Sequence, residues 1–257
     1  ILKRYPSLTN GLVIGGPPCQ PFSGLNTEKK GFQDGRSDGI PNYVRLVMKL
    51  KELAPRIQWD DMMENVASML PSDRASITQQ LAQLHTRPPY WVDAAQVGQI
   101  SRPRLYWTSW PVTGCGFTTK DSGLGYVQVR NSTTERVPVS AFLDPGVEKC
   151  GTKPFPTAVR WIERNRPPPS PAGIDDCDPE TLEKWEGSRF AMPPYQFKRE
   201  LGVVTSEGEE RPPNADEREK LHGYKPQHTK GFPEGRRISF IGNSFHCVVV
   251  ACLLASW

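Results

Sequence analysis

The chain is predicted to fold as an α/β protein, from two observations within residues 11–110. Short apolar runs alternate there with segments whose apolar residues recur at helical spacing, as strands and helices do when they pack on each other. One such run, Leu12-Val13-Ile14, ends in the turn Gly15-Gly16-Pro17-Pro18, as a buried strand does where it leaves a sheet. The alternation predicts a parallel sheet with helices on its faces.

The elements of this part follow from the same periodicities. Residues 12–15 form the first predicted strand, and apolar residues at helical spacing predict a helix from Ile40 to about Leu53, closed by Pro55. The other predictions are strands over 57–64, 90–97 and 105–110 and a helix over 74–85. Asp60 and Asp61 interrupt the strand over 57–64, which we interpret as a sheet edge or a locally degenerate strand.

Between about Val112 and Glu210 the regular pattern breaks down. The proline cluster at residues 167–171 predicts a stiff extended linker, and residues 178–185 predict a short helix. Regular structure returns afterwards. Asn214 with Glu217 three residues later is a capping-box pattern, and Gly223 supplies a stop, so a helix is expected over 215–222.

The C-terminal segment is apolar. Asn243 or Ser244 is predicted to cap a final helix that ends near Trp257.

Composition sets broad limits on function. The chain has 257 residues, of which 37% are hydrophobic and 23% charged, which is ordinary for a globular protein. A net charge of +4 permits a polyanionic partner without establishing one. The 6 cysteines form no Cys-x-x-Cys pair and only 4 histidines occur, so neither a metal site nor a disulfide framework is suggested and a reducing compartment is expected.

The expected localisation is intracellular. We see no apolar run of transmembrane length and no signal-peptide pattern, so no membrane partner is expected. The expected compartment is the nucleus in a eukaryote and otherwise the cytoplasm.

Cys19 is the first candidate for chemistry. It follows the Gly/Pro turn at the carboxyl end of the predicted strand, where open α/β sheets bind ligands. Prolines on both sides stiffen the loop, which suits a thiolate that must meet a substrate atom at a set distance. A single cysteine is more often a small buried hydrophobe than a nucleophile, so the interpretation depends on the other motifs.

Five motifs occur in a characteristic order: Pro18-Cys19-Gln20, Glu64-Asn65-Val66, Arg102-x-Arg104, Arg211 with Glu217, and Gly242-Asn243-Ser244. In this order they resemble the cytosine-C5 DNA methyltransferase family, and in style they are most similar to the de novo DNA methyltransferases. The resemblance implies a Rossmann-like, S-adenosylmethionine-dependent methyltransferase fold and DNA as the partner.

One departure from the family concerns the N-terminus. The family opens with a Phe-x-Gly-x-Gly turn and an acidic residue that together hold most of S-adenosylmethionine, and here Cys19 is preceded by only 18 residues. We therefore expect an N-terminally incomplete domain. By resemblance, residues 1–111 are catalytic core, 112–210 a loop-rich target recognition region, and 211–257 the C-terminal part of the core.

The resemblance also implies catalytic roles. The Cys19 thiolate would add to C6 of a cytosine, since C5 alone is a poor nucleophile. Glu64 would act as the acid at N3, and Arg104 would bind the cytosine O2. Arg102 is taken as a further catalytic cation, whereas Asn65 is expected to hold the loop.

Binding residues are implied in the same way. S-adenosylmethionine would contact Pro18 together with Asn243, Ser244 and Phe245. An N-terminal segment, in cis or in trans, would supply the rest of the cofactor site. The target cytosine would be flipped out of the DNA duplex. The DNA strand would be contacted by loop residues, namely Gln20, Ser23, Lys29, Lys30 and Arg36.

Two other functions compete with this one. A catalytically inactive, DNA-binding or regulatory relative would keep the fold, and the missing glycine turn favours it, whereas the joint presence of Cys19, Glu64 and Arg104 favours an enzyme. An RNA methyltransferase of the tRNA-aspartate branch would carry a Cys-Phe-Thr motif before the Arg-x-Arg strand. No cysteine lies between Val66 and Arg102, so DNA is favoured.

Overall fold

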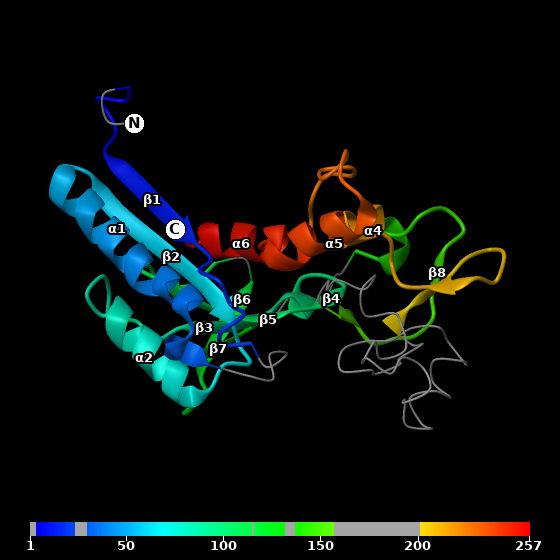
Figure 1. Ribbon diagram of the computed structural model, residues 1–257, viewed down its shortest axis with the longest axis horizontal. Coiled ribbons are helices and arrows are strands. Elements are labelled where there is room, and N and C mark those ends of the chain that lie inside the picture. The colour runs from blue at the N-terminus through cyan, green and yellow to red at the C-terminus, as the bar shows by residue number, and fades with distance from the viewer. Residues whose placement is uncertain (1–3, 24–29, 115, 132–136, 157–200) are drawn as a thin grey trace. The chain divides into compact units, whose positions relative to one another are not determined.

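Figure 1 shows the computed structural model of the chain, which describes residues 4–23, 30–114, 116–131, 137–156 and 201–257. The chain divides into two compact units. The first contains residues 1–93, 103–133 and 252–257, and the second contains residues 94–102 and 134–251. The expected linker at 167–171 and helix at 178–185 lie outside the described residues. The predicted division into three segments, drawn by role in the family, stays a prediction.

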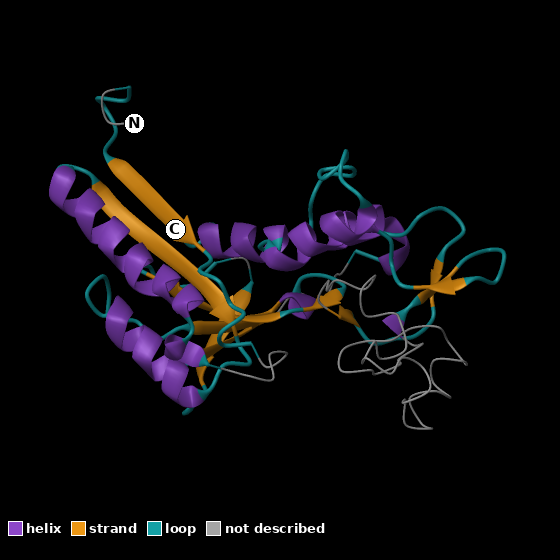
Figure 2. Ribbon diagram, in the orientation of Figure 1, coloured by secondary structure: helices purple, strands orange, loops and turns teal. Residues whose placement is uncertain are grey.

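The first unit is built on a six-stranded sheet with the order β1-β2-β5-β3-β7-β6. Figure 2 shows the strands in orange and the helices in purple. β1 runs parallel to β2, and β3 runs parallel to β7. β5 is antiparallel to both of its neighbours, and β6 is antiparallel to β7. The strand bounds are Asn10–Gly15 for β1, Gln58–Val66 for β2, Tyr90–Asp93 for β3, Pro103–Thr108 for β5, Phe117–Asp121 for β6 and Val127–Asn131 for β7.

The prediction of a parallel sheet is therefore wrong, because the sheet is mixed. β3 and β5 are joined by residues 94–102, whereas a return crossover between parallel strands needs about a dozen residues or more. The chain must then come back antiparallel. The strands themselves lie where expected, although β3 ends at Asp93 and β5 begins at Pro103 and ends at Thr108.

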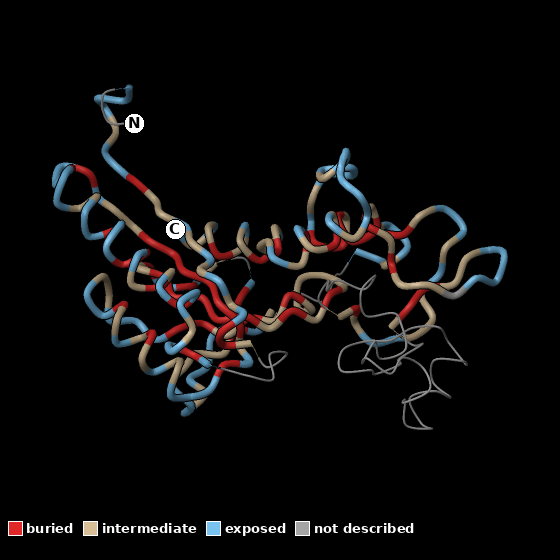
Figure 3. The backbone as a smooth tube through the Cα atoms, in the orientation of Figure 1, coloured by how far each residue is buried: buried red, intermediate tan, exposed pale blue. Residues whose placement is uncertain are grey.

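Two helices pack on one face of this sheet, α1 (Gly39–Leu53) and α2 (Pro71–Leu81). Their buried side chains share one core with sheet residues such as Met63, Leu105 and Trp107. Figure 3 shows the buried residues in red along the strands and on these helices. The predicted helix over 40–53 is confirmed as α1. α2 begins earlier than predicted because Pro71 occupies its first turn, where a missing N–H costs nothing, and it ends at Leu81.

Asp60 and Asp61 do not mark a sheet edge, contrary to one of the two interpretations above. β2 has β1 on one side and β5 on the other. Asp60 accepts hydrogen bonds from Ser109 Oγ at 2.7 Å and from Trp257 Nε1 at 2.9 Å. Asp61 is fully buried, with Oδ2 lying 3.5 Å from His85 Nε2. The hydrogen bonds of Asp60 explain why an inner strand tolerates it, whereas neither Asp61 carboxylate oxygen has a hydrogen-bond partner within the described residues.

The described residues of the second unit form two small sheets. In one, β4 (Ile100–Ser101) runs parallel to β9 (Phe155–Pro156), and the other has the order β11-β10-β8. Its described apolar core comprises Ile100, Leu143, Phe155, Val203 and Leu221. The remaining bounds are Glu148–Lys149 for β8, Val203–Val204 for β10, Glu210–Arg211 for β11, Ala215–Leu221 for α4, Glu234–Asn243 for α5 and Cys247–Leu254 for α6. Short 3-10 turns occur at Gly31–Gln33, Gly35–Asp38, Ala94–Gln96 and Val139–Ala141.

The predicted capping box of α4 is confirmed. Asn214 Oδ1 accepts from the Glu217 N–H, and Glu217 Oε2 accepts from the Asn214 N–H, both at 2.8 Å. Glu217 also forms a two-point ion pair with Arg211, at 2.6 Å and 3.1 Å. Gly223 follows the helix at φ +83°, a left-handed conformation that glycine adopts without strain.

The predicted cap of the final helix is wrong. Asn243 is the last residue of α5, and Ser244 is the C-cap of that helix. The final helix, α6, begins at Cys247. Local sequence misled the prediction because Asn and Ser are favoured at helix starts, whereas here Arg102 binds backbone carbonyls of this turn.

The segment Glu234–Leu254 is long and apolar enough, by length and composition, to cross a membrane. This corrects the expectation that no such run occurs. Core helices of water-soluble proteins meet the same criterion, and here the segment is assigned as two helices, with the break at residues 244–246.

Candidate active site

Cys19 lies in the first unit, in the loop that follows β1. Its carbonyl accepts a hydrogen bond from the Phe22 N–H at 3.0 Å, and Phe22 is almost fully buried in the core. Phe22 also meets the edge of Phe32, with 5.2 Å between ring centroids. The half-buried Cys19 packs against the same core. The loop that carries the thiol is therefore anchored close to it.

The residues after the loop are ordered by their own hydrogen bonds. Gly31, at φ +50°, donates from its N–H to Pro21 O at 3.2 Å. Asp34 accepts from the Arg36 guanidinium at 3.0 Å and 2.6 Å, and these hydrogen bonds lower the pKa of Asp34 to about 2. Arg36, a predicted DNA contact, is exposed and already pairs with a carboxylate.

The other predicted DNA contacts divide between described and undescribed residues. Gln20 and Lys30 are exposed and Ser23 is half-buried, so the surface of this loop is accessible to a DNA strand. Lys29 lies outside the described residues.

Glu64 and Arg104 face each other from adjacent strands of the same unit. In the β2–β5 register Glu64 pairs with Tyr106 and Val66 with Arg104, so Glu64 and Arg104 are diagonal neighbours on one face. Arg104 Nε lies 2.8 Å from Glu64 Oε1, and each side chain is 11% exposed. Glu64 Oε1 has no aligned hydrogen-bond donor, so this contact is an ion pair rather than a linear hydrogen bond.

Asn65 connects this pair to the cysteine loop. It is fully buried, and its Nδ2 donates to Pro17 O at 3.4 Å while its Oδ1 accepts from the Val66 N–H at 2.8 Å. This contact matches the loop-holding role expected of it from sequence. Because Gly15 pairs with Met63, the loop leaves β1 at the same end of the sheet as Glu64. The structure thus brings Cys19, Glu64 and Arg104 to one end of one sheet.

Arg102 belongs to the second unit and has different partners. Its Nη1 donates to Gly242 O at 3.1 Å and its Nη2 to Ser244 O at 2.6 Å. The side chain is buried. Two arginines that sequence reasoning grouped as catalytic cations therefore have separate environments.

The predicted cofactor residues also divide between the units. Pro18, in the first, is exposed. In the second, Asn243 is exposed and its Nδ2 donates to Ser239 O at 2.9 Å, whereas Ser244 Oγ donates to Ile241 O at 2.8 Å. Taken unit by unit, the exposed Asn243 carboxamide and the Phe245 ring suit a polar and an apolar part of S-adenosylmethionine, and the Pro18 ring suits an apolar part. None of the four is a carboxylate that could accept from ribose hydroxyls, so these residues fit only part of it.

Sequence reasoning missed two buried histidines in the second unit, His222 and His246. Their ring centroids lie 5.8 Å apart. Burial, followed by the charge of Arg102, lowers the pKa of both, to about 4 for His246. Both imidazoles are therefore neutral at pH 7. His222 is the fifth residue after Glu217 and His246 the second after Ser244, but nothing in the sequence says that a histidine there is buried.

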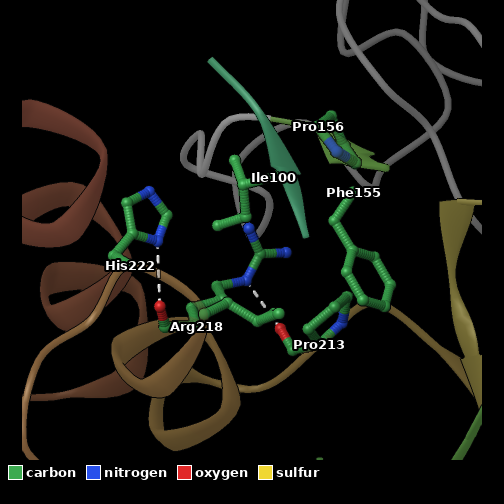
Figure 4. Close-up of a pocket in the computed structure, with 7 residues that line it drawn as sticks. Ile100, Phe155, Pro156, Pro213, Arg218 and His222 are labelled. Atoms are coloured by element: carbon green, nitrogen blue, oxygen red, sulfur yellow. Dashed lines mark hydrogen bonds between the residues drawn. The ribbon is translucent and has the colours of Figure 1, made fainter. Parts of the chain in front are cut away.

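Figure 4 shows His222 where it lines a small pocket of the second unit. Its Nδ1 lies 2.9 Å from Arg218 O, and because a carbonyl only accepts, Nδ1 carries the proton. Arg218 Nε donates to Pro213 O at 2.6 Å, and burial lowers the pKa of Arg218 to about 9. The other walls are mostly apolar, formed by Ile100, Phe155, Pro156 and Leu221. These contacts hold α4 in place and use none of the predicted site residues.

Comparison with known proteins supports the family resemblance over part of the chain. Residues 3–94 match the family model of C-5 cytosine-specific DNA methylases. The chain is 34% identical over 109 residues to Type II methyltransferase M.AplI of Arthrospira platensis, a stretch that covers 38% of this chain and 29% of that protein. The matched stretch therefore spans less than a third of this relative.

Solved structures establish the fold class. The structure of the Entamoeba histolytica methyltransferase EhMeth aligns with a TM-score of 0.51 and 17% identity, over 95% of this chain and 75% of that one. The S. pombe Dnmt2 methyltransferase aligns with a TM-score of 0.47 and 13% identity, over 95% and 76%. The alignment with EhMeth shows that the chain has the α/β methyltransferase fold, here with a mixed sheet.

Proposed function

We propose that this chain is the catalytic region of a DNA (cytosine-5-)-methyltransferase, closest to the de novo type, that uses S-adenosylmethionine. The observation that carries the proposal is the grouping of Cys19, Glu64 and Arg104 at one end of one sheet, with Asn65 bridging the loop and the strand. Cys19 and Glu64 lie within the residues that match the C-5 cytosine-specific DNA methylase family.

The proposed reaction begins at cytosine C6. The Cys19 thiolate forms a bond to C6, and the electrons of the C5–C6 double bond move toward C5 while negative charge spreads to N3 and O2. Glu64 places a proton at N3, and the fixed charge of Arg104 stabilises O2. S-adenosylmethionine, when bound, would supply an electrophilic methyl group to C5 and leave as S-adenosylhomocysteine. Loss of the C5 proton to a base then expels the Cys19 thiolate, and N3 returns its proton to Glu64, which restores the ring.

The contact between Glu64 and Arg104 suits this division of labour. An ion pair at 2.8 Å holds both side chains on one face of the sheet. Because Oε1 is buried against Arg104, the proton would pass to N3 from the other carboxylate oxygen, Oε2. The Arg104 guanidinium acts as a fixed cation beside the developing anion.

DNA would reach the site as an extruded cytosine, because C6 is buried in the base stack of a duplex. Gln20, Ser23, Lys29, Lys30 and Arg36 would contact the strand, for which Arg36 would exchange Asp34 for a phosphate. Residues 112–210 would recognise the target sequence. We place this activity in the nucleus of a eukaryote, or otherwise in the cytoplasm.

We further propose that an N-terminal segment, in cis or in trans, completes the cofactor site and pairs with the edge of the sheet at β1. The support is β1, which has β2 as its one sheet neighbour in the described part of the chain. An unpaired edge of this kind can accept another strand. That segment would carry the glycine turn and the acidic ribose contact that the resemblance implies.

Methyl transfer tests the proposed function. The 257-residue chain is assayed alone and with the upstream segment of its gene restored, with duplex DNA and RNA of matching sequence as substrates. We expect formation of 5-methylcytosine in DNA, together with micromolar binding of S-adenosylmethionine, when the segment is restored. Transfer to RNA alone would favour the RNA methyltransferase, and binding of DNA without transfer would favour the inactive relative; either result contradicts the proposal.

A further inference from the structure

Both terminal nitrogens of the Arg102 side chain donate to backbone carbonyls at the end of α5. Nη1 reaches Gly242 O at 3.1 Å and Nη2 reaches Ser244 O at 2.6 Å. We infer that Arg102 is a positioning residue that fixes the Gly242–Ser244 turn, and with it Asn243, for the cofactor. This inference rests on the proposed function, since the cofactor role of Asn243 does.

The end of a helix is a favourable place for such a cation. The last carbonyls of α5 lack partners within the helix, and the helix dipole places partial negative charge there. A planar guanidinium can serve two of them at once, which a lysine ammonium does less well. With only 3% of its surface exposed, Arg102 makes these bonds largely shielded from water.

A third carbonyl of the turn is also held from outside. Tyr224 donates from its hydroxyl to Phe245 O at 3.1 Å. The carbonyls of Gly242, Ser244 and Phe245 are therefore bound by side chains distant in sequence, two by Arg102 and one by Tyr224. Asn243 lies between two fixed peptide groups, so the backbone from which its carboxamide projects is set before any ligand binds.

The start of α6 is tied to the same cluster. The Cys247 N–H donates to His222 O at 2.9 Å, and His246 Nδ1 accepts from the Val249 N–H at 3.5 Å. Burial and the neighbouring charge of Arg102 lower the pKa of both histidines, so neither adds a second positive charge beside the guanidinium. Arg102 thus sits at the centre of the connection between α5 and α6.

These contacts distinguish the role of Arg102 from that of Arg104. Arg104 forms an ion pair with Glu64, the carboxylate expected to contact the reacting base, whereas both terminal nitrogens of Arg102 donate to backbone carbonyls. Arg102 therefore acts on the reaction through the turn, and its loss should weaken cofactor binding more than it slows methyl transfer.

Amide hydrogen exchange of the 257-residue chain, without cofactor, tests the structural half of this inference. We compare Arg102→Met and Arg102→Lys with Arg237→Met, a control on α5 whose guanidinium binds Asp216 and Glu219. Arg102→Met should speed exchange at residues 244–250 by about tenfold or more, and Arg102→Lys by less, because charged hydrogen bonds of this kind are lost in whole or in part. Unchanged exchange there in Arg102→Met would overturn the inference.

Steady-state kinetics of the active protein tests the functional half. Arg102→Lys should raise KM for S-adenosylmethionine about tenfold while kcat changes less than about twofold, as expected when only ground-state binding is lost. A fall in kcat at constant KM would make Arg102 catalytic and contradict the positioning role. If the unsubstituted protein transfers no methyl group, the proposed function fails, and hydrogen exchange still decides the role of Arg102.

Discussion

Arg102 and Arg104 are separated by one residue, yet they lie in different units and have different electrostatic environments. In the first unit Arg104 meets a carboxylate, and the pair retains some exposure. In the second, Arg102 is buried among backbone carbonyls and two neutral histidines. The difference teaches that a charged motif cannot be assigned one role as a block. Each residue takes its role from the element it meets.

The two environments also explain which groups can react. A carboxylate beside a guanidinium, in a pair whose side chains are each 11% exposed, can come into contact with a ligand and share a proton with it. A guanidinium whose terminal nitrogens are already bonded can only hold what it touches. The first arrangement suits catalysis and the second suits positioning, so substitutions in the two units should change different kinetic parameters.

The largest effect on turnover is expected from a substitution that removes the proposed catalytic acid. Glu64→Gln should lower kcat by ~10²–10⁴, because a well-placed acid contributes about that much, while DNA affinity changes only a few-fold. Turnover with duplex DNA and binding by fluorescence anisotropy measure the two quantities. Glu52→Gln, at an exposed glutamate on α1, is the matched control and should behave as the unsubstituted protein does. Normal turnover in Glu64→Gln would make Glu64 a structural residue.

A smaller effect concerns the histidines beside Arg102. His246 has its pKa lowered from 6.5 to about 4 in the folded chain, so between these values the unfolded chain binds more protons. Its contribution to the free energy of unfolding is therefore complete above pH 6.5 and is lost as the pH falls toward 4. A shift of this size corresponds to about 3 kcal/mol, and His222 should act in the same direction.

Urea unfolding at pH 7.5 and pH 5 measures this loss. The His246→Gln variant should show a smaller decrease in unfolding free energy over that interval, since the amide does not titrate. An equal decrease in the variant and the unsubstituted chain would mean that other groups cause the acid sensitivity.

Much of the first unit could be predicted because its elements are local patterns. β1 and α1 lie where apolar periodicity and Pro55 place them. In the second unit, the capping box at Asn214 could likewise be predicted from two residues, Asn214 and Glu217. The direction of each strand could not be predicted in this way, because it depends on which strands become neighbours. The antiparallel course of β5 follows from its place between β2 and β3.

The site divides in the same way. Cys19, Glu64 and Arg104 could be proposed because they stand in motifs whose order the family shares. The role of Arg102 and the burial of His222 and His246 could not be predicted. The first depends on contacts between residues more than a hundred positions apart, and the second on two side chains that lie on either side of a turn. Sequence alone also misassigned Ser244, which ends one helix rather than starting the next.

The central claim is that Cys19 is the nucleophile, and the most direct measurement is covalent trapping on duplex DNA that contains 5-fluorocytosine. Fluorine at C5 cannot leave as a proton does, so the enzyme should remain bonded to C6 after methyl transfer. Mass spectrometry of the complete, active protein should locate the adduct on the peptide that contains Cys19. Cys19→Ser should abolish it, and Cys150→Ser, at a half-buried cysteine of the second unit, should leave it unchanged. An adduct of undiminished yield in Cys19→Ser would contradict the account.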